Sequence, residues 1–174
     1  MPASTRDFIG LHTAQRLSST MSRPLAGVFE TLAEQHRQAI ALLRDAASAQ
    51  PPSKRSERWA AARRWLLSHE QAEMDTVFSA LEGYLGADSL LKLHTQQAIV
   101  LESAINQLES TNLESEAWLE RLQDVITLLD DHLDDEENEL FRRAQELLGE
   151  NTARELDEPF TTRQRELLKL LAPA

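Results

Sequence analysis

The sequence contains no cysteine. This absence excludes disulfide bonds, Cys-ligated zinc or iron–sulfur sites, and thiol catalysis. It also contains no apolar run of the roughly 18 residues that would be needed to cross a bilayer. The N-terminal stretch has no continuous apolar core of the kind found in signal peptides. We therefore expect a cytoplasmic protein with no membrane partner.

Glycine and aromatic residues are also scarce. The chain of 174 residues has five glycines, and aromatic residues make up 5% of it. Strands and their turns draw heavily on aromatic residues, β-branched residues and glycine, so this composition favours helices. The length suits a single domain with a sizeable core. We expect an all-α fold.

Basic residues are outnumbered, with 18 of them against 29 acidic residues, which gives a formal net charge of −11. A protein that binds nucleic acid needs a basic face to displace counterions from the phosphates, and none is visible in the sequence. Nucleic acid is therefore not an expected partner. An excess of carboxylates is compatible with cation binding, but only their positions can support that interpretation.

The hydrophobic pattern predicts four long helices. Within each of them, apolar residues recur at steps of three and four, which places them on one face. Prolines and glycines separate the four stretches, and the connections are short. Such helices most simply form an up-down-up-down four-helix bundle. The expected helices are residues 25–48, 53–81, 88–110 and 114–148.

The chain divides into three predicted parts. Residues 1–24 form an N-terminal extension, and residues 25–148 form the four-helix bundle. Residues 149–174 form a C-terminal packing segment, which contains Pro159 and ends in LLKLLAPA. We expect one short helix in this last segment.

Histidine occurs once on the apolar face of each predicted helix, as His36, His69, His94 and His132. A single histidine on an apolar face is more often a core or boundary residue than a metal ligand. Four of them on four helices would require four separate buried hydrogen-bond partners. One shared metal site would satisfy all four together.

Two glutamates strengthen the case for a metal site. Glu73 follows His69 by four residues, and Glu136 follows His132 by four, so each pair shares a helix face. Burial of an unpaired carboxylate is costly, and a bound cation offsets that cost. Imidazole and carboxylate ligands without sulfur suit Fe, Mn or Zn.

These motifs resemble the hemerythrin-like, or HHE cation-binding, family. The family has a lone His on the first helix, His-x-x-x-Glu on the second and fourth, and a His on the third. The matching segments here are AEQHRQAI, SHEQAEMDTVF, KLHTQQA and DHLDDEENELF. The resemblance implies a non-haem di-iron centre, with Glu73 and Glu136 bridging two Fe ions and the histidines shared between them. It also implies binding of O₂ or a related diatomic such as NO.

The sequence departs from the oxygen-carrying hemerythrins at the third helix. The carriers have two histidines four residues apart there, whereas Leu90 and Ala98 lie four residues to either side of His94. Glu70 could complete the ligand set, as an equivalent glutamate does in some relatives, or it could be a solvated residue of the helix surface. The absence of a second histidine on the third helix argues against simple reversible oxygen transport more than against metal binding.

Three functions remain open from the sequence. The first is a protein that binds or senses O₂ or NO, which we favour over an enzyme. The second is a di-iron redox enzyme or repair factor that acts on peroxide or NO. The family's iron–sulfur repair members carry a cysteine-bearing N-terminal segment, and this chain has no cysteine. The third is a metal-independent helical interaction module. The sequence does not identify a protein partner.

Overall fold

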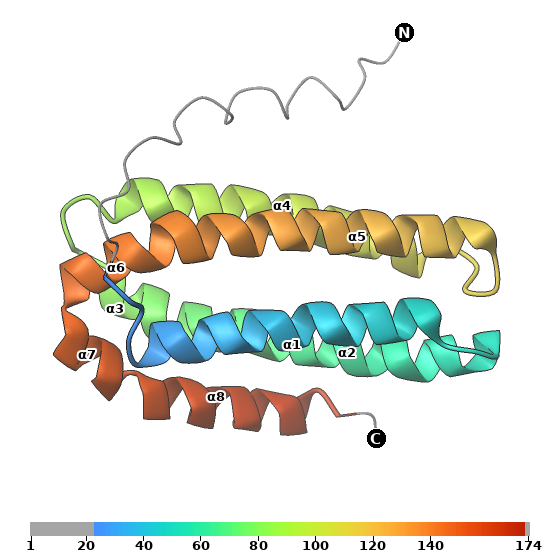
Figure 1. The fold of residues 1–174 in the computed structure, drawn as a ribbon, viewed down its shortest axis with the longest axis horizontal. Helices are drawn as coiled ribbons and strands as arrows, with labels where there is room; N and C mark the ends of the chain where they lie inside the picture. The colour runs from blue at the N-terminus through green and yellow to red at the C-terminus, as the bar shows by residue number, and fades with distance from the viewer. Residues whose placement is uncertain (1–22, 173–174) are drawn as a thin grey trace, which may run out of the picture.

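The computed structural model describes residues 23–172, and every regular element in that range is a helix. The all-α prediction is therefore confirmed. Figure 1 shows long helical segments that run along the molecule, with the C-terminal helix α8 (Asp157–Leu170) along one side. Residues 1–22 of the predicted N-terminal extension lie outside the described residues. None of the described helices combines the length and apolarity needed to span a membrane.

The helix boundaries follow the predicted ones closely, except in the C-terminal segment. Two of the long segments are interrupted by single π-helical stretches, labelled η2 and η3. The elements are α1 (Val28–Ser48), α2 (Pro52–Glu73), η2 (Met74–Phe78), α3 (Ser79–Leu81), α4 (Asp88–Glu109), α5 (Glu116–Asp135), η3 (Glu136–Leu140), α6 (Phe141–Leu148), α7 (Glu150–Glu155) and α8 (Asp157–Leu170).

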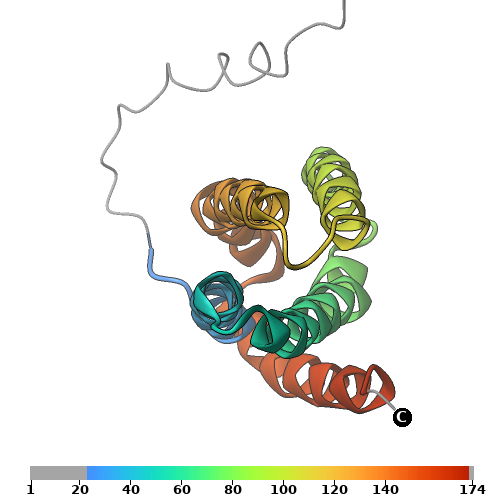
Figure 2. The same ribbon diagram turned by 90° about the vertical axis from the view of Figure 1, so that its right-hand side faces the viewer.

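The C-terminal segment is larger than the single short helix that the sequence predicted. It contains α7 and the 14-residue helix α8. Phe160 and Leu167 of α8 are buried in the core, and α8 packs against α2 and α1. Figure 2 shows α8 on the outer side of these two helices, away from α4 and α5. Pro159 lies in the first turn of α8, where a proline is tolerated, so it does not limit the helix.

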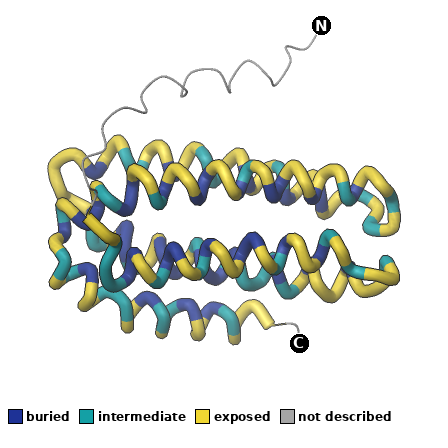
Figure 3. Tube along the Cα trace, in the orientation of Figure 1, coloured by how far each residue is buried: buried dark blue, intermediate teal, exposed yellow. Residues whose placement is uncertain are grey.

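The apolar core forms two clusters, one towards each end of the long helices. One cluster centres on residues such as Leu43, Leu66 and Leu122. The other contains Phe29, Phe141 and the buried residues of α7 and α8. Figure 3 shows that the buried positions face inwards along all the long helices. The four histidines of the long helices lie along the chain between residues of these two clusters, so the polar site is enclosed by apolar packing on both sides.

Both π-helical stretches occur at a His-x-x-x-Glu motif. The stretch η2 begins directly after Glu73, and η3 begins at Glu136. Two adjacent buried residues lie at the end of each stretch, Val77-Phe78 within η2 and Leu140-Phe141 at the junction of η3 and α6. An extra residue in the turn shifts the phase of the helix, so the glutamate and these later residues can all face inwards. Such π-bulges are frequent at functional sites.

The backbone at Gly27, just before α1, lies directly against the backbone of α7. It precedes α1 with φ of 58°, a left-handed conformation that favours glycine. A Cβ atom at this position would overlap the carbonyl group of Ala153 in α7. The close backbone approach therefore requires glycine for two independent reasons.

We predict that Gly27→Ala destabilises the protein far more than Gly83→Ala does. Gly83 also has a positive φ, of 83°, but a Cβ there would meet no atom within 4 Å. Gly83→Ala should cost about 1–2 kcal/mol for the backbone conformation alone. Gly27→Ala should cost about 3 kcal/mol or more, because the steric overlap adds to the strain. Denaturant unfolding of the two variants measures the difference, and equal losses would contradict the close approach to α7.

Candidate metal centre

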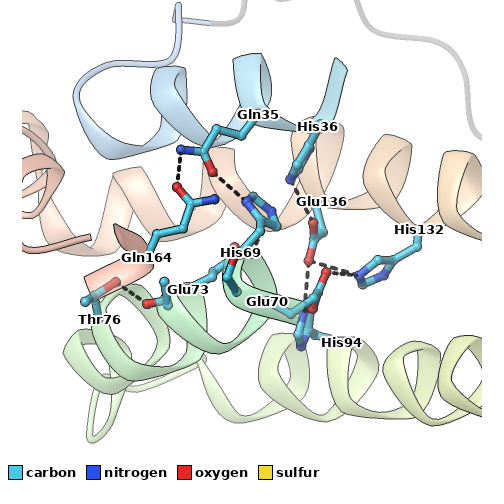
Figure 4. A network of polar contacts seen from close by, with 12 residues as sticks. Gln35, His36, His69, Glu70, Glu73, Thr76, His94, His132, Glu136 and Gln164 are labelled. Carbon is cyan, nitrogen blue, oxygen red and sulfur yellow. Dashed lines mark hydrogen bonds and ion pairs between the residues drawn. The ribbon is translucent and has the colours of Figure 1, made fainter. Parts of the chain in front are cut away.

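The four histidines of the long helices meet at the centre of the molecule. They come from α1, α2, α4 and α5, and all are buried, with exposed fractions between 0% and 3%. Figure 4 shows their imidazoles turned towards the side chains of Glu73, Glu136 and Glu70. The seven residues that the sequence predicted as ligands therefore lie in one cluster. They are His36, His69, Glu70, Glu73, His94, His132 and Glu136.

The imidazoles form two pairs. The ring centroids of His36 and His69 are 5.1 Å apart, and those of His94 and His132 are also 5.1 Å apart. Glu73 is completely buried, and its Oε2 lies 3.8 Å from Nε2 of His69. This arrangement gives two groups of ligand atoms instead of one.

Glu136 lies between the two histidine pairs. Its Oε2 is 3.4 Å from Nε2 of His36, in the first pair. Its Oε1 is 2.9 Å from Nε2 of His94 and 3.3 Å from Nε2 of His132, in the second. One carboxylate with an oxygen directed at each pair has the geometry of a bridging ligand. This follows from its position in η3, four residues after His132.

Glu70 belongs to the second group. Its Oε1 lies 3.8 Å from Nε2 of His132, and its Oε2 lies 3.7 Å from Nε2 of His94. The side chain is 20% exposed, so it is not a fully solvated surface residue. Of the two interpretations left open by the sequence, the structure agrees with the one that places Glu70 in the cluster.

The ligand atoms can be grouped around possible metal positions. In each of three sets, the ligand atoms lie within 4.8 Å of one another. Two of the sets share no residue. The third set contains one residue from each of the other two sets, together with Glu136. The sets are His36, His69 and Glu73; Glu70, His94 and His132; and Glu73, His94 and Glu136.

The inward atoms of the cluster have no hydrogen-bond partner among residues 23–172. These atoms are Nε2 of all four histidines, Oε1 of Glu70, and both carboxylate oxygens of Glu73 and Glu136. A buried polar atom without a partner costs about 1–3 kcal/mol, and more if it is charged. So many unpaired nitrogen and oxygen atoms facing one another fit a bound cation, which all of them could ligate. The residues present therefore suit a His- and carboxylate-ligated metal.

The outward nitrogens of three histidines are hydrogen-bonded instead. Nδ1 of His69 is 2.9 Å from Oε1 of Gln35, and Nδ1 of His132 is 3.2 Å from Oε1 of Gln97. Nδ1 of His36 is 2.9 Å from Oε1 of Glu137. An amide or carboxylate oxygen only accepts a hydrogen bond, so each of these three imidazoles, when neutral, carries its proton on Nδ1. Its Nε2 then offers a lone pair to the centre, as a metal ligand requires.

The ionisation of the cluster is strongly perturbed. Burial, together with repulsion from Glu136, raises the pKa of Glu73 well above its usual value. Burial also lowers the pKa of His69 to about 3. For His132, burial acts downwards, but Glu70 and Glu136 outweigh it and raise the pKa to about 9. For Glu70, burial acts upwards, but His132 outweighs it and lowers the pKa to about 2. Without a cation, these shifts favour a protonated Glu73 and a protonated His132 beside an ionised Glu70.

Two depressions lie beside the cluster. An open groove of about 520 Å³ between α1 and α5 reaches His36 and Glu137 and is otherwise lined by Arg37, Arg44 and Asp130, among others. A much smaller pocket of about 10 Å³ lies between α4 and α5, next to His94 and Glu136. The small pocket has room for about one water-sized molecule.

The sequence analysis missed the hydrogen-bond partners of the histidines. Gln97 could have been found, because it lies one helical turn after His94 and so shares its helix face. Glu137 directly follows Glu136, and the shifted phase of η3 is what brings it to His36. Asp135, the other acidic neighbour, is exposed and accepts a hydrogen bond from Gln97 at 2.7 Å.

Comparison with known proteins supports the same interpretation. A family model described as hemerythrin HHE cation binding domain matches residues 27–144. The match includes all seven residues of the cluster and ends before α7 and α8. The resemblance inferred from the motifs is therefore confirmed. Neither the curated proteins nor the solved structures gave a match to this chain.

We predict opposite effects for two glutamine substitutions in the metal-free protein at pH 7. The folded-state pKa of Glu73 is raised, so its contribution to stability is present below about pH 4.5 and is lost as the pH rises. Glu73→Gln should therefore raise the melting temperature, with each 1 kcal/mol giving roughly 2–4 °C. The folded-state pKa of Glu70 is lowered, so its contribution is present above about pH 4.5 and is lost towards pH 2. Glu70→Gln should lower the melting temperature.

Thermal unfolding of both variants between pH 4 and pH 8 checks this prediction. The gain from Glu73→Gln should shrink towards pH 4, where the wild-type carboxyl is protonated in both the folded and the unfolded chain. A loss of stability in metal-free Glu73→Gln at pH 7 would contradict the assigned burial cost.

Proposed function

This chain belongs to the hemerythrin HHE cation-binding family, and on that premise we propose that it is a cytoplasmic, non-haem di-iron protein that binds or senses O₂ or a related diatomic such as NO. The observation that carries the proposal is the position of Glu136, whose two carboxylate oxygens face the two histidine pairs separately. Two bound irons would supply a redox-active centre with an exchangeable coordination position for the diatomic.

The proposal divides the ligands between two metal positions. His36 and His69 would hold one iron and His94 and His132 the other, with Glu70 completing the second set. Glu73 and Glu136 would bridge the two. Support comes from the unpaired Nε2 and carboxylate oxygens, which all face the centre of the cluster. Mn or Zn would suit the same ligands, since neither imidazole nor carboxylate selects strongly among these metals.

The third helix offers space for a small ligand beside the second metal position. The pocket next to His94 and Glu136 is lined by Leu90, Leu93 and Leu140, among others. Leu90 occupies one of the two positions at which an oxygen carrier could have its additional histidine. An apolar side chain there supplies no ligand atom, so a coordination position would remain free. The volume of about 10 Å³ has room for about one water-sized molecule, which favours a small ligand over a larger substrate.

The proposal also includes the arrangement of the chain. Residues 25–148 would form the up-down-up-down bundle that holds the metals, because each long helix is joined to the next by a short connection. Residues 149–174 would form a separate packing segment on the outside of α1 and α2.

We predict that the iron-loaded protein contains two irons per chain and absorbs visible light as an oxo-bridged di-iron centre. Glu136→Gln should lose most of this iron, because Glu136 contacts both histidine pairs. Glu139→Gln is the matched control, since Glu139 lies on the same π-helical stretch but is exposed. Metal analysis and visible spectroscopy measure the result. Fewer than about one iron per chain in the wild type, without oxo-bridge absorption, would contradict the di-iron centre.

Thermal unfolding separates this function from a metal-independent interaction module. A metal that binds only the folded state at 100 times its Kd stabilises it by about 2.7 kcal/mol. Chelation should therefore lower the melting temperature by roughly 5–11 °C. An interaction module with structural histidines would show no change on chelation.

A further inference from the structure

The C-terminal helix α8 reaches the metal centre although it lies outside the residues that match the family model. The match ends at residue 144, and α8 begins at Asp157. Phe160 of α8 is completely buried, and its ring is perpendicular to that of His69 with 6.0 Å between centroids. Arg163 pairs with Asp75 of η2 at 2.7 Å. The helix α8 therefore packs directly against His69.

A chain of hydrogen bonds connects α8 to the same histidine. Nε2 of Gln35 donates to Oε1 of Gln164 in α8 at 2.7 Å. Oε1 of Gln35 is 2.9 Å from Nδ1 of His69. Figure 4 shows the three side chains in this order, with Gln35 between the other two. Gln164 is 5% exposed, so the chain is protected from water at its outer end.

The direction of each hydrogen bond follows from the chemistry of the amide. Gln164 offers its carbonyl oxygen, so Gln35 must present its NH₂ group on that side. The carbonyl oxygen of Gln35 is then turned towards His69, which must donate from Nδ1. If the amide of Gln35 rotated by half a turn, its NH₂ group would face Nδ1 and favour the wrong tautomer. With the carbonyl oxygen of Gln164 as its acceptor, Gln35 therefore leaves Nε2 of His69 as the nitrogen free for a metal.

Within the part of the chain that the structure describes, only the carbonyl half of the Gln164 amide has a hydrogen-bond partner. Among residues 23–172, its Nε2 is one of the buried atoms without a hydrogen-bond partner. A buried unpaired donor costs about 1–3 kcal/mol, whereas an apolar side chain of similar size would avoid that cost. An apolar side chain would pack here without the cost of the unpaired Nε2, but it would not provide the oxygen that accepts the hydrogen bond from Gln35.

We propose that Gln164 is a positioning residue for the metal centre, acting through Gln35 to hold His69 in the tautomer that ligates metal. The C-terminal helix is then part of the centre. Loss of a residue that hydrogen-bonds a metal-bound histidine directly, as Gln35 does with His69, typically costs about 10–100-fold in metal affinity, which is the upper limit for a residue that acts through it. The metal-binding part of this inference rests on the proposed function, but the tautomer of His69 does not.

The test compares Gln164→Met, which removes the acceptor, with Gln164→Glu, which retains one. Long-range ¹⁵N–¹H NMR of the metal-free protein at pH 7 reports the tautomer of His69. We expect the Nδ1–H form in the wild type and in Gln164→Glu, and a mixture of both forms in Gln164→Met. Anaerobic Fe(II) titration should show an affinity that is lower by up to about 10–100-fold for Gln164→Met, and recovery in Gln164→Glu.

Leu167→Ala is the control for a purely structural role of α8. Leu167 is buried in the apolar core on the same helix. This variant should lower the melting temperature but leave the tautomer of His69 unchanged. An unchanged tautomer in Gln164→Met, or the same mixture in Leu167→Ala, would overturn the proposal. Failure of the wild type to bind iron would instead contradict the proposed function, and the tautomer would still test the role of Gln164.

Discussion

The burial of Glu73 and Glu136 at the centre of the helices is the constraint on which the rest of the structure depends. Their side chains are 0% and 1% exposed, and their oxygens have no hydrogen-bond partner in the described part of the chain. Carboxylates in such a position need protons or a cation. In the absence of a cation, the raised pKa of Glu73 favours its protonated form. The four imidazoles around them could supply the other ligands for a cation.

The surrounding elements satisfy this constraint together. The two apolar clusters exclude water above and below the polar layer, which strengthens every charge interaction within it. The π-helical stretches at the two glutamates allow those side chains and the next apolar residues to face inwards. Amide and carboxylate oxygens fix Nδ1 of three histidines, and one of these amides is itself held by α8.

Local periodicity made much of this predictable. Four helices, their approximate ends and six of the clustered residues follow from apolar spacing and from the four-residue step between His and Glu, whereas Glu70 was suggested only by the family resemblance. Three features did not follow. The phase shift at η3 that brings Glu137 to His36 needs a non-α turn. The C-terminal helix α8 is longer than the short helix that was expected, because it packs against α1 and α2, and Gln164 meets Gln35 only through tertiary packing. In each case contacts between distant segments outweigh the local pattern.

The central claim is that this cluster holds two metals rather than one or none. Diffraction from crystals of the iron-loaded protein, recorded on both sides of the iron absorption edge, tests it most directly. Our account predicts two anomalous peaks within the cluster, one beside His36 and His69 and one beside His94 and His132, with Glu136 between them. A single peak, or no peak among these residues, would contradict it.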